Sequence, residues 1–450
     1  MKTKILSLVS AIALLVAIIH SCRSDDSSSS STSSASVSAL TCSSVTYSAV
    51  ATTGIAYSAT ATVPYTGGNG VAYSAGSAIS STGITGLTAT LNAGTLASGA
   101  GNLTYTISGT PSGSGTANFA ISFGGQSCTL SLAVGTAATA SDCSSLSGVS
   151  KLVCLVDNFK ATLSSTQLSQ AQLSYTFSNI KTWSNLPAGM SARLGIRLGN
   201  LNATQLAAAK AIIKEMSETT TNEGWEEVQQ LWLADDYLYA NGGGSTYGAG
   251  NYYLAFFGTP STSGTFEIMM TGHHKTVANT YKNGALVAAT PHFAAVEPLS
   301  FSASGTTYAP INQEQAAFAA ILAGLSSTEL ASAKSSSTFT DLVLGPNNNW
   351  AFPTTSAGLK CSSLTAAQKQ LVLNAIKTYV YDIDDANAAS IFATYSSEID
   401  NTYILYSGTT GMSTKNDYFR IDGPHVWIEF TVQGGIVLSG VHYHSVWRTV

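Results

Sequence analysis

Charge is what this chain has least of. Asp, Glu, Lys and Arg make up 10% of its 450 residues, whereas about 25% is usual in globular proteins. The formal net charge is −5 and there is no run of basic residues, which argues against a nucleic-acid partner. Residues 27–141 contain no Asp, Glu, Lys, Arg or His at all. Acid–base or metal chemistry is therefore not expected in that segment.

Several sequence signatures of catalysis are also absent. No Gly-x-Ser-x-Gly, P-loop or dinucleotide fingerprint occurs in a strand–helix context. No Cys-x-x-Cys spacing indicates a zinc site. The acidic cluster Asp382, Asp384 and Asp385 lacks the spacing of a calcium loop, so we expect it to cap a helix.

The N-terminus has the features of an export signal. Lys2 and Lys4 precede an apolar stretch, residues 5–19, which is too short for a membrane span of about 20 residues. The sequence Ile-His-Ser-Cys that ends at Cys22 resembles a bacterial lipoprotein box, in which the cysteine is acylated. We therefore expect a signal peptide at 1–21, a Ser-rich tether at 22–38 and a lipid anchor on Cys22. The location would be the outer membrane or cell surface of a Gram-negative bacterium. The alternative is an ordinary signal peptide with a chance cysteine.

The remaining cysteines are candidates for disulfides in an oxidising compartment. One pair would bracket the uncharged segment and another would close a short loop, which leaves Cys361 unpaired. The predicted pairs are Cys42–Cys128 and Cys143–Cys154.

Residues 39–135 show the pattern of a small β-sandwich. Short alternating runs such as 103–107 and 117–123 are separated by Gly- and Pro-rich turns. Two of these turn regions, 64–70 and 109–111, resemble the immunoglobulin-like repeats of bacterial surface proteins. We expect a spacer, or alternatively an adhesive or glycan-binding module, followed by a linker at 136–142.

Residues 143–450 predict an α+β domain with a largely antiparallel sheet and flanking helices. Near-copies of a capping box, in which Ser, Asn or Thr precedes Gln or Glu by three residues, mark helix starts at 164, 202, 326 and 365. The expected helices are 164–174, 203–217, 223–239, 312–325, 327–335, 365–381 and 386–398. The expected strands are 252–257, 265–270, 277–281, 402–406, 418–421, 426–432 and 441–446.

All histidines outside the leader lie after residue 270, and they are the main candidates for chemistry. On a strand, His442 and His444 share one face with Arg448, and two imidazoles on one strand can bind one metal. His273 and His274 would point to opposite faces unless Gly272 introduces a bend. We therefore expect one of the two to line a site and the other to pack. The histidines are His273, His274, His292, His425, His442 and His444.

Two carboxylates accompany these imidazoles. Glu297, in a loop before Pro298, and Glu429, in mid-strand, are candidate metal ligands, orienting groups or general bases. Together with Arg448 they are the candidate catalytic residues. The alternative for Glu429 is a buried ion pair with Arg420 or Arg448.

The cofactor predicted for His273, His274, His442 and His444 is copper or zinc, and the alternative is a neutral hydrogen-bonding site. The order of a histidine pair, a single histidine and His-x-His resembles that of copper type II monooxygenases, with Met412 as the candidate for their methionine. His292, which follows Pro291 in an expected loop, and His425 are further candidates.

The region from residue 143 to the end resembles a bacterial family called domain of unknown function 3500. The resemblance rests on stretches 253–260, 271–279, 290–298, 358–359, 423–429 and 442–448. It implies a common site but no reaction. The residues it groups are Gly272, His273, His274, Asn279, Glu297, His442, His444 and Arg448.

The sequence thus predicts an exported, lipid-anchored protein with a histidine-lined site for metal-dependent hydrolysis or oxidation. The alternative is a non-catalytic surface module that binds glycan or peptide, with structural histidines.

Overall fold

The computed structural model describes residues 33–136, 141–346, 348 and 350–450. The predicted signal peptide, most of the tether and Cys22 lie outside the described residues. Within these ranges no helix is both long and apolar enough to cross a membrane.

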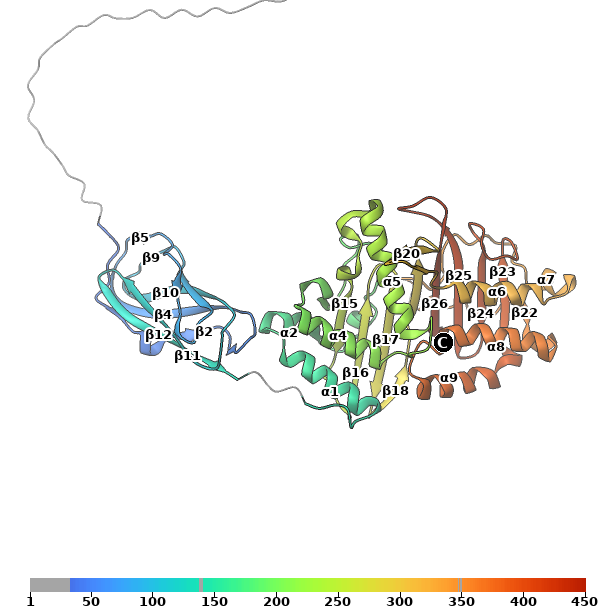
Figure 1. Ribbon diagram of the computed structural model, residues 1–450, viewed down its shortest axis with the longest axis horizontal. Helices are drawn as coiled ribbons and strands as arrows, with labels where there is room; N and C mark the ends of the chain where they lie inside the picture. Colours follow the sequence, from blue (N-terminus) through green and yellow to red (C-terminus); the bar gives the residue numbers. More distant parts are fainter. Residues whose placement is uncertain (1–32, 137–140, 347, 349) are drawn as a thin grey trace, which may run out of the picture.

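The uncharged segment folds into two facing sheets (Figure 1). Small and aromatic side chains that alternate along the strands, such as Ala61, Tyr105 and Phe119, fill the space between the sheets. The Cys42–Cys128 disulfide is present as predicted. One sheet holds β1 (Ala39–Leu40), β2 (Thr46–Tyr47), β4 (Tyr57–Asn69), β6 (Ile79–Ser80), β8 (Leu87–Leu91) and β10 (Ser98–Gly109), and the other holds β3 (Ala51–Thr52), β7 (Thr82–Gly83), β11 (Gly115–Phe123) and β12 (Gln126–Gly135), while β5 (Ala72–Tyr73) pairs with β9 (Gly94–Thr95).

The C-terminal region is built on one twelve-stranded sheet. Its strand pairs are antiparallel except for β13 with β15, so the predicted α+β class is confirmed at this level. A separate hairpin, β20 (Phe301–Ala303) with β21 (Thr306–Tyr308), lies outside it. The sheet strands are β13 (Gln172–Leu173), β14 (Ile196–Arg197), β15 (Tyr253–Phe257), β16 (Thr265–Thr271), β17 (Lys275–Lys282), β18 (Ala285–Ala288), β19 (His292–Val296), β22 (Leu359–Lys360), β23 (Tyr403–Ser407), β24 (Tyr418–Asp422), β25 (Val426–Gly434) and β26 (Val441–Thr449).

The helices begin where the capping boxes predict. In each of the four boxes both reciprocal hydrogen bonds are formed, which satisfies backbone N–H groups at the helix start. The first helix, α1, was not predicted, and its N-cap residue Ser147 makes no side-chain cap. The Cys143–Cys154 disulfide, which was predicted, ties this helix to the preceding chain. The helices are α1 (Gly148–Ala161), α2 (Ser165–Ala171), α3 (Phe177–Ile180), α4 (Ala203–Glu215), α5 (Gly224–Leu238), α6 (Asn312–Ala323), α7 (Ser327–Ala333), α8 (Ala366–Val380) and α9 (Asp385–Ser397).

The domain consists of two halves with the same order of elements. The strands β14, β15, β16 and β17 of the first half correspond to β22, β23, β24 and β25 of the second, and β18 and β19 together correspond to β26. The capping-box helices α2 and α4 correspond to α7 and α8. The two halves meet where β19 pairs with β26, so the strand order reads alike from either edge of the sheet.

Helices cover one face of the sheet and connections cover the other. Residues of α1, α4 and α5 pack on β15 to β17, and residues of α6 and α8 pack on β23 to β26; these helices lie in front of the sheet in Figure 1. On the opposite face, Trp183 and Leu342, from connections before β14 and β22, pack against Phe293 and Val446.

A buried ion network joins the helices to the sheet. Lys275 on β17 is 0% exposed, and its Nζ lies 3.0 Å from both Glu227 Oε1 of α5 and Asp382 Oδ2, just after α8. Burial opposes the lysine charge, but the two carboxylates raise the pKa of Lys275. His292 Nε2 lies 2.8 Å from Asp382 Oδ2. His292 therefore belongs to strand β19 and to this network, and the prediction that it lies in a loop is wrong.

The substitution Lys275→Met should destabilise the fold strongly, because it leaves two buried carboxylates without their cation. We expect the free energy of unfolding, measured by urea denaturation, to fall by about 3–5 kcal/mol. Lys282→Met, at the exposed end of the same strand, is the matched control and should change it by about 0.5 kcal/mol or less. Equal, small effects of both substitutions would show that the network does not hold the helices to the sheet.

Candidate functional site

His273 and His274 lie in the turn between β16 and β17. Gly272 N–H donates to the Lys275 carbonyl (3.0 Å), which closes the turn. A Cβ at position 272 would come within 2.1 Å of the Tyr252 ring, so only glycine fits there. The two imidazoles stack with ring centroids 3.5 Å apart, and both line the same pocket. The prediction that only one of them faces the site is wrong, because they belong to the turn and not to a regular strand.

His442 and His444 reach the same pocket from β26. They share one face of the strand, as alternation predicted, and line the pocket together. The β19–β26 register pairs His444 with Ala295, so His442 lies beside the end of β19, where Glu297 follows. The ring of His274 lies 6.1 Å from that of His442 and 5.9 Å from that of His444.

The four histidines line a pocket of about 310 Å³. The pocket is bounded by both halves of the domain and by the connection before β14. Its other lining residues are Asn185, Leu186, Pro187, Met190, Tyr247, Glu297, Asp341, Gln433 and Ile436.

Two carboxylates that the sequence did not indicate orient these imidazoles. Asp235 of α5 accepts a hydrogen bond from His273 Nδ1 (2.7 Å), and its other oxygen accepts from Gly248 N–H (2.9 Å). Asp341, in the connection after α7, lies 3.2 Å from His444 Nδ1. In both pairs a carboxylate holds Nδ1, so that Nε2 carries the lone pair.

The Nε2 atoms of His442 and His444 lie 3.0 Å apart, facing each other. Since two N–H groups cannot point at one another at that distance, at least one of these imidazoles is neutral. Burial, followed by the neighbouring His444, lowers the pKa of His442 to about 3. Burial, followed by the other three histidines, holds the pKa of His274 well below its usual value. Both rings are therefore neutral at pH 7, the form in which imidazole binds metals.

Glu297 lines the histidine pocket, but its carboxylate is hydrogen-bonded to backbone N–H groups. One oxygen, Oε1, accepts hydrogen bonds from the N–H groups of Ile436, Val437 and Leu438 at 2.7–2.9 Å. The carboxylate thus fixes the loop between β25 and β26, which lies at the pocket mouth.

Glu429 is fully buried away from the pocket. It accepts hydrogen bonds from the Tyr418 hydroxyl (2.6 Å) and from the N–H groups of Val343 and Leu344. Burial raises its pKa. These hydrogen bonds anchor the segment that carries Asp341, and Glu429 also interacts electrostatically with Arg448.

Three other candidates lie outside the histidine pocket. Asn279 lies on β17 among residues packed against helices, and its Nδ2 donates to the Tyr281 hydroxyl (3.2 Å). His425 Nδ1 lies 2.6 Å from Glu398 Oε1, and its side chain is 56% exposed. Met412, proposed as a copper ligand, is buried in the hydrophobic core. The grouping of Asn279 with the histidines fails because one residue on a strand cannot face both sides of the sheet.

His425 occupies the turn that corresponds to that of His274. Gly423 N–H donates to the Val426 carbonyl, just as Gly272 donates to Lys275. In the first half, however, Ala285 and Ala288 of β18 lie opposite β17. At the corresponding positions of the second half, His442 and His444 of β26 lie opposite β25. The histidine cluster therefore exists on one side of the duplicated sheet.

No metal site is already formed in the described part of the chain. Within residues 33–136, 141–346, 348 and 350–450, no group of three or more His, Cys, Asp or Glu side chains is arranged to hold a metal ion. Among the hydrogen bonds within the described residues, one joins two of these four histidines: Nε2 of His442 and Nε2 of His444 lie 3.0 Å apart.

Comparison with known proteins gives one match. A family model described as "Protein of unknown function (DUF3500)" matches residues 146–450. No curated protein and no solved structure matches.

Arg448 shares the face of His442 and His444, as alternation predicted, but lies about 13 Å beyond His444 along the strand. It lines a second cavity, of about 300 Å³, together with Glu267 and Trp350. Burial lowers the pKa of Arg448 to about 10. The resemblance that grouped Arg448 with the histidines is therefore not matched by a shared pocket.

Glu267 in that second cavity should make stability depend on pH. Burial raises its pKa from 4.5 to about 7, so between these values the folded state binds more protons than the unfolded state. Its contribution to stability is full below pH 4.5 and is lost as pH rises through 7, by about 3 kcal/mol. We expect Glu267→Gln to match the parent protein at pH 4.5 and to be more stable by that order at pH 8, in urea denaturation. A difference that does not change with pH would contradict the shift.

Proposed function

We propose that this chain, which belongs to the family described as "Protein of unknown function (DUF3500)", carries a divalent transition-metal centre in its histidine pocket, and that the metal activates water for hydrolysis. The observation that carries the proposal is the pair of Nε2 atoms from His442 and His444, which face each other 3.0 Å apart.

The donor set fits zinc or copper, the metals that imidazole ligands favour. A carboxylate behind each of His273 and His444 fixes the imidazole tautomer, which is the usual outer-shell arrangement at histidine metal sites. The residues that would hold such a metal are His442 and His444, through their facing Nε2 atoms, and His274 as the third imidazole. The metal would supply a Lewis acid that makes a bound water acidic.

The Asp235–His273 pair is suited to accept a proton. Asp235 is 1% exposed and holds Nδ1 of His273. No hydrogen-bond partner of His273 Nε2 is found in the described part of the chain, and the ring lines the pocket. A buried carboxylate that orients an imidazole also stabilises the imidazolium formed when Nε2 takes a proton. With a metal bound, His273 would be the group placed to take a proton from an acidified water.

The pocket walls favour a substrate with an apolar portion. Leu186, Pro187, Met190 and Ile436 line the pocket, and Leu186, Met190 and Ile436 are exposed. Tyr247 packs edge-on against His273, with ring centroids 4.7 Å apart. These residues can hold an apolar group against the histidines while the bond to be hydrolysed meets the activated water.

Metal analysis of the protein purified without a histidine tag tests the proposal. We expect about one zinc or copper ion per chain by inductively coupled plasma mass spectrometry, and its loss in the double variant His442→Ala/His444→Ala. Asp341→Asn should weaken metal affinity by about 10- to 100-fold, because Asp341 lies behind the ligand His444. The matched control is His425→Ala, because His425 occupies the corresponding turn and makes no contact with the pocket.

The same variants separate binding from chemistry. With p-nitrophenyl acetate as a probe, the metal-loaded protein should hydrolyse the ester faster than the metal-free protein, and Asp235→Asn should lower this rate at saturating metal. Absence of metal from the wild-type protein, with no binding at micromolar zinc or copper, would refute the metal centre. Metal binding without any rate difference would refute the hydrolytic role.

We further propose that the protein is anchored to the outer membrane or cell surface through lipid on Cys22. Support comes from the apolar leader and from the Ser-rich residues that follow the cysteine. In a Gram-negative host, metabolic labelling with an alkyne fatty acid should mark the wild-type protein and not Cys22→Ala. Labelling that persists in Cys22→Ala would show that this cysteine is not the anchor.

A further inference from the structure

Another cavity lies beside the histidine pocket, on the same face of the sheet. Its volume is about 550 Å³. It forms where the connection before β14 meets the connection before β22, one from each half. Its lining residues are Phe177, Lys181, Thr182, Trp183, Ser191, Ala192, Asn348, Trp350 and Ala351.

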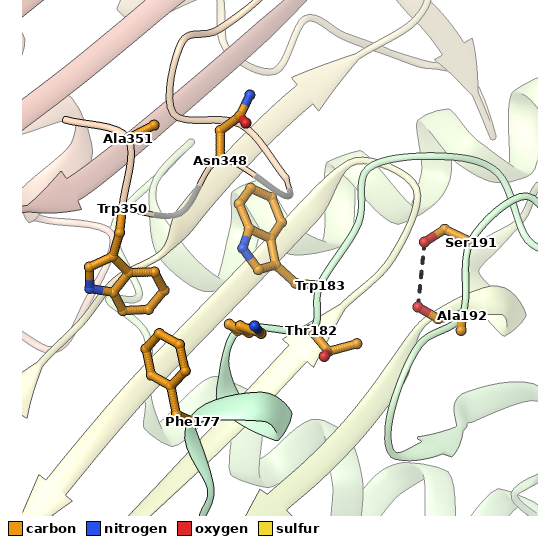
Figure 2. Close-up of a pocket in the computed structure, with 9 residues that line it drawn as sticks. Phe177, Thr182, Trp183, Ser191, Ala192, Asn348, Trp350 and Ala351 are labelled. Atoms are coloured by element: carbon orange, nitrogen blue, oxygen red, sulfur yellow. Dashed lines mark hydrogen bonds between the residues drawn. The ribbon is translucent and has the colours of Figure 1, made fainter. Parts of the chain in front are cut away.

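Three aromatic rings line this cavity (Figure 2). The rings of Phe177 and Trp350 lie 4.8 Å apart at a tilt of 58°, yet each residue remains 58% exposed. Trp183, which is only 3% exposed, lies beside them in Figure 2. Two large aromatic side chains exposed side by side form an apolar patch, and such patches in a hollow mark binding sites.

The remaining walls are polar and almost uncharged. Thr182, Ser191 and Asn348 offer hydroxyl and amide groups. Among the described residues that line the cavity, Lys181 provides the only charge and alanines are the only aliphatic residues. A peptide side chain would find little aliphatic wall, and a nucleic acid would need more basic groups.

We propose that this cavity binds carbohydrate. A sugar ring presents apolar C–H groups on its face and hydroxyls around its edge. The exposed faces of Phe177 and Trp350 match the first, and the Thr, Ser and Asn side chains match the second.

The cavity and the histidine pocket share one wall. The segment 181–192 contributes Trp183 and Ser191 to the cavity, and it contributes Asn185 and Met190 to the pocket. Between them, Trp183 packs on Phe293 (5.6 Å) and Phe293 on His444 (5.6 Å). We propose that a chain of several sugars held at Trp350 reaches the histidines along segment 181–192, so that the substrate class of the proposed hydrolytic site is a glycan. This last step rests on the proposed function, whereas carbohydrate binding does not.

Titration of the protein with soluble hexasaccharides tests the proposal. The probes are cellohexaose, xylohexaose, mannohexaose and chitohexaose, and decaproline is the peptide probe. Binding of each probe is measured by tryptophan fluorescence and by calorimetry. We expect saturable binding of at least one saccharide and none of decaproline. Trp350→Ala and Phe177→Ala should each weaken binding by about tenfold. Tyr239→Ala is the matched control, because this aromatic side chain is 55% exposed and does not line the cavity.

Failure of this proposal is distinguishable from failure of the metal centre. Trp350→Ala should retain the metal content of the wild type, and His442→Ala/His444→Ala should retain saccharide affinity. Three outcomes would each overturn the carbohydrate assignment. The first is that no saccharide binds at 10 mM ligand, about the weakest useful affinity, and the second is that decaproline binds instead. The third is that the Trp350→Ala/Phe177→Ala double variant binds saccharide as well as the wild type does. Saccharide binding without release of shorter products by the metal-loaded protein would overturn only the link to hydrolysis.

Discussion

The pairing of β19 with β26 is the contact on which the C-terminal structure depends. It joins two halves that have the same element order into one continuous sheet. It also decides which residues become neighbours across the junction. Because His444 pairs with Ala295, the start of β26 lies beside the end of β19 and near the turn of His273 and His274. A shift of this register by one residue would turn His442 and His444 to the helix-covered face.

Several of the chain's few charged residues position other groups. Lys275 and its carboxylates fix α5 and the end of α8 against the sheet. The same helix α5 carries Asp235, eight residues after Glu227 and so about two turns further along. One helix therefore supports the sheet through Glu227 and orients His273 through Asp235. Removal of charge from one of these two residues is expected to affect the other through the position of the helix.

Local patterns in the sequence predicted much of this fold and part of the site. The capping boxes gave the starts of α2, α4, α7 and α8, because a cap depends on residues only three apart. Strand alternation placed His442 and His444 together. The partners Asp235 and Asp341 were missed because they come from a helix and a connection whose positions depend on tertiary packing. The duplication was missed too, although the repeated capping boxes and the two Gly-x-His turns, at Gly272 and Gly423, were visible in the sequence.

The unequal chemistry of the two equivalent halves bears on how the site works. Both halves keep the hydrogen-bonded turn, which closes the hairpin and so serves the fold. Only the junction side combines that turn with His442 and His444, whereas the corresponding strand positions hold Ala285 and Ala288. The turn thus has a structural role in both halves. Folding does not require histidine at the positions of His442 and His444, because the first half has alanine at the corresponding positions. Since four buried imidazoles cost free energy of desolvation and add little to packing, their presence on one side is best explained by the chemistry of the pocket.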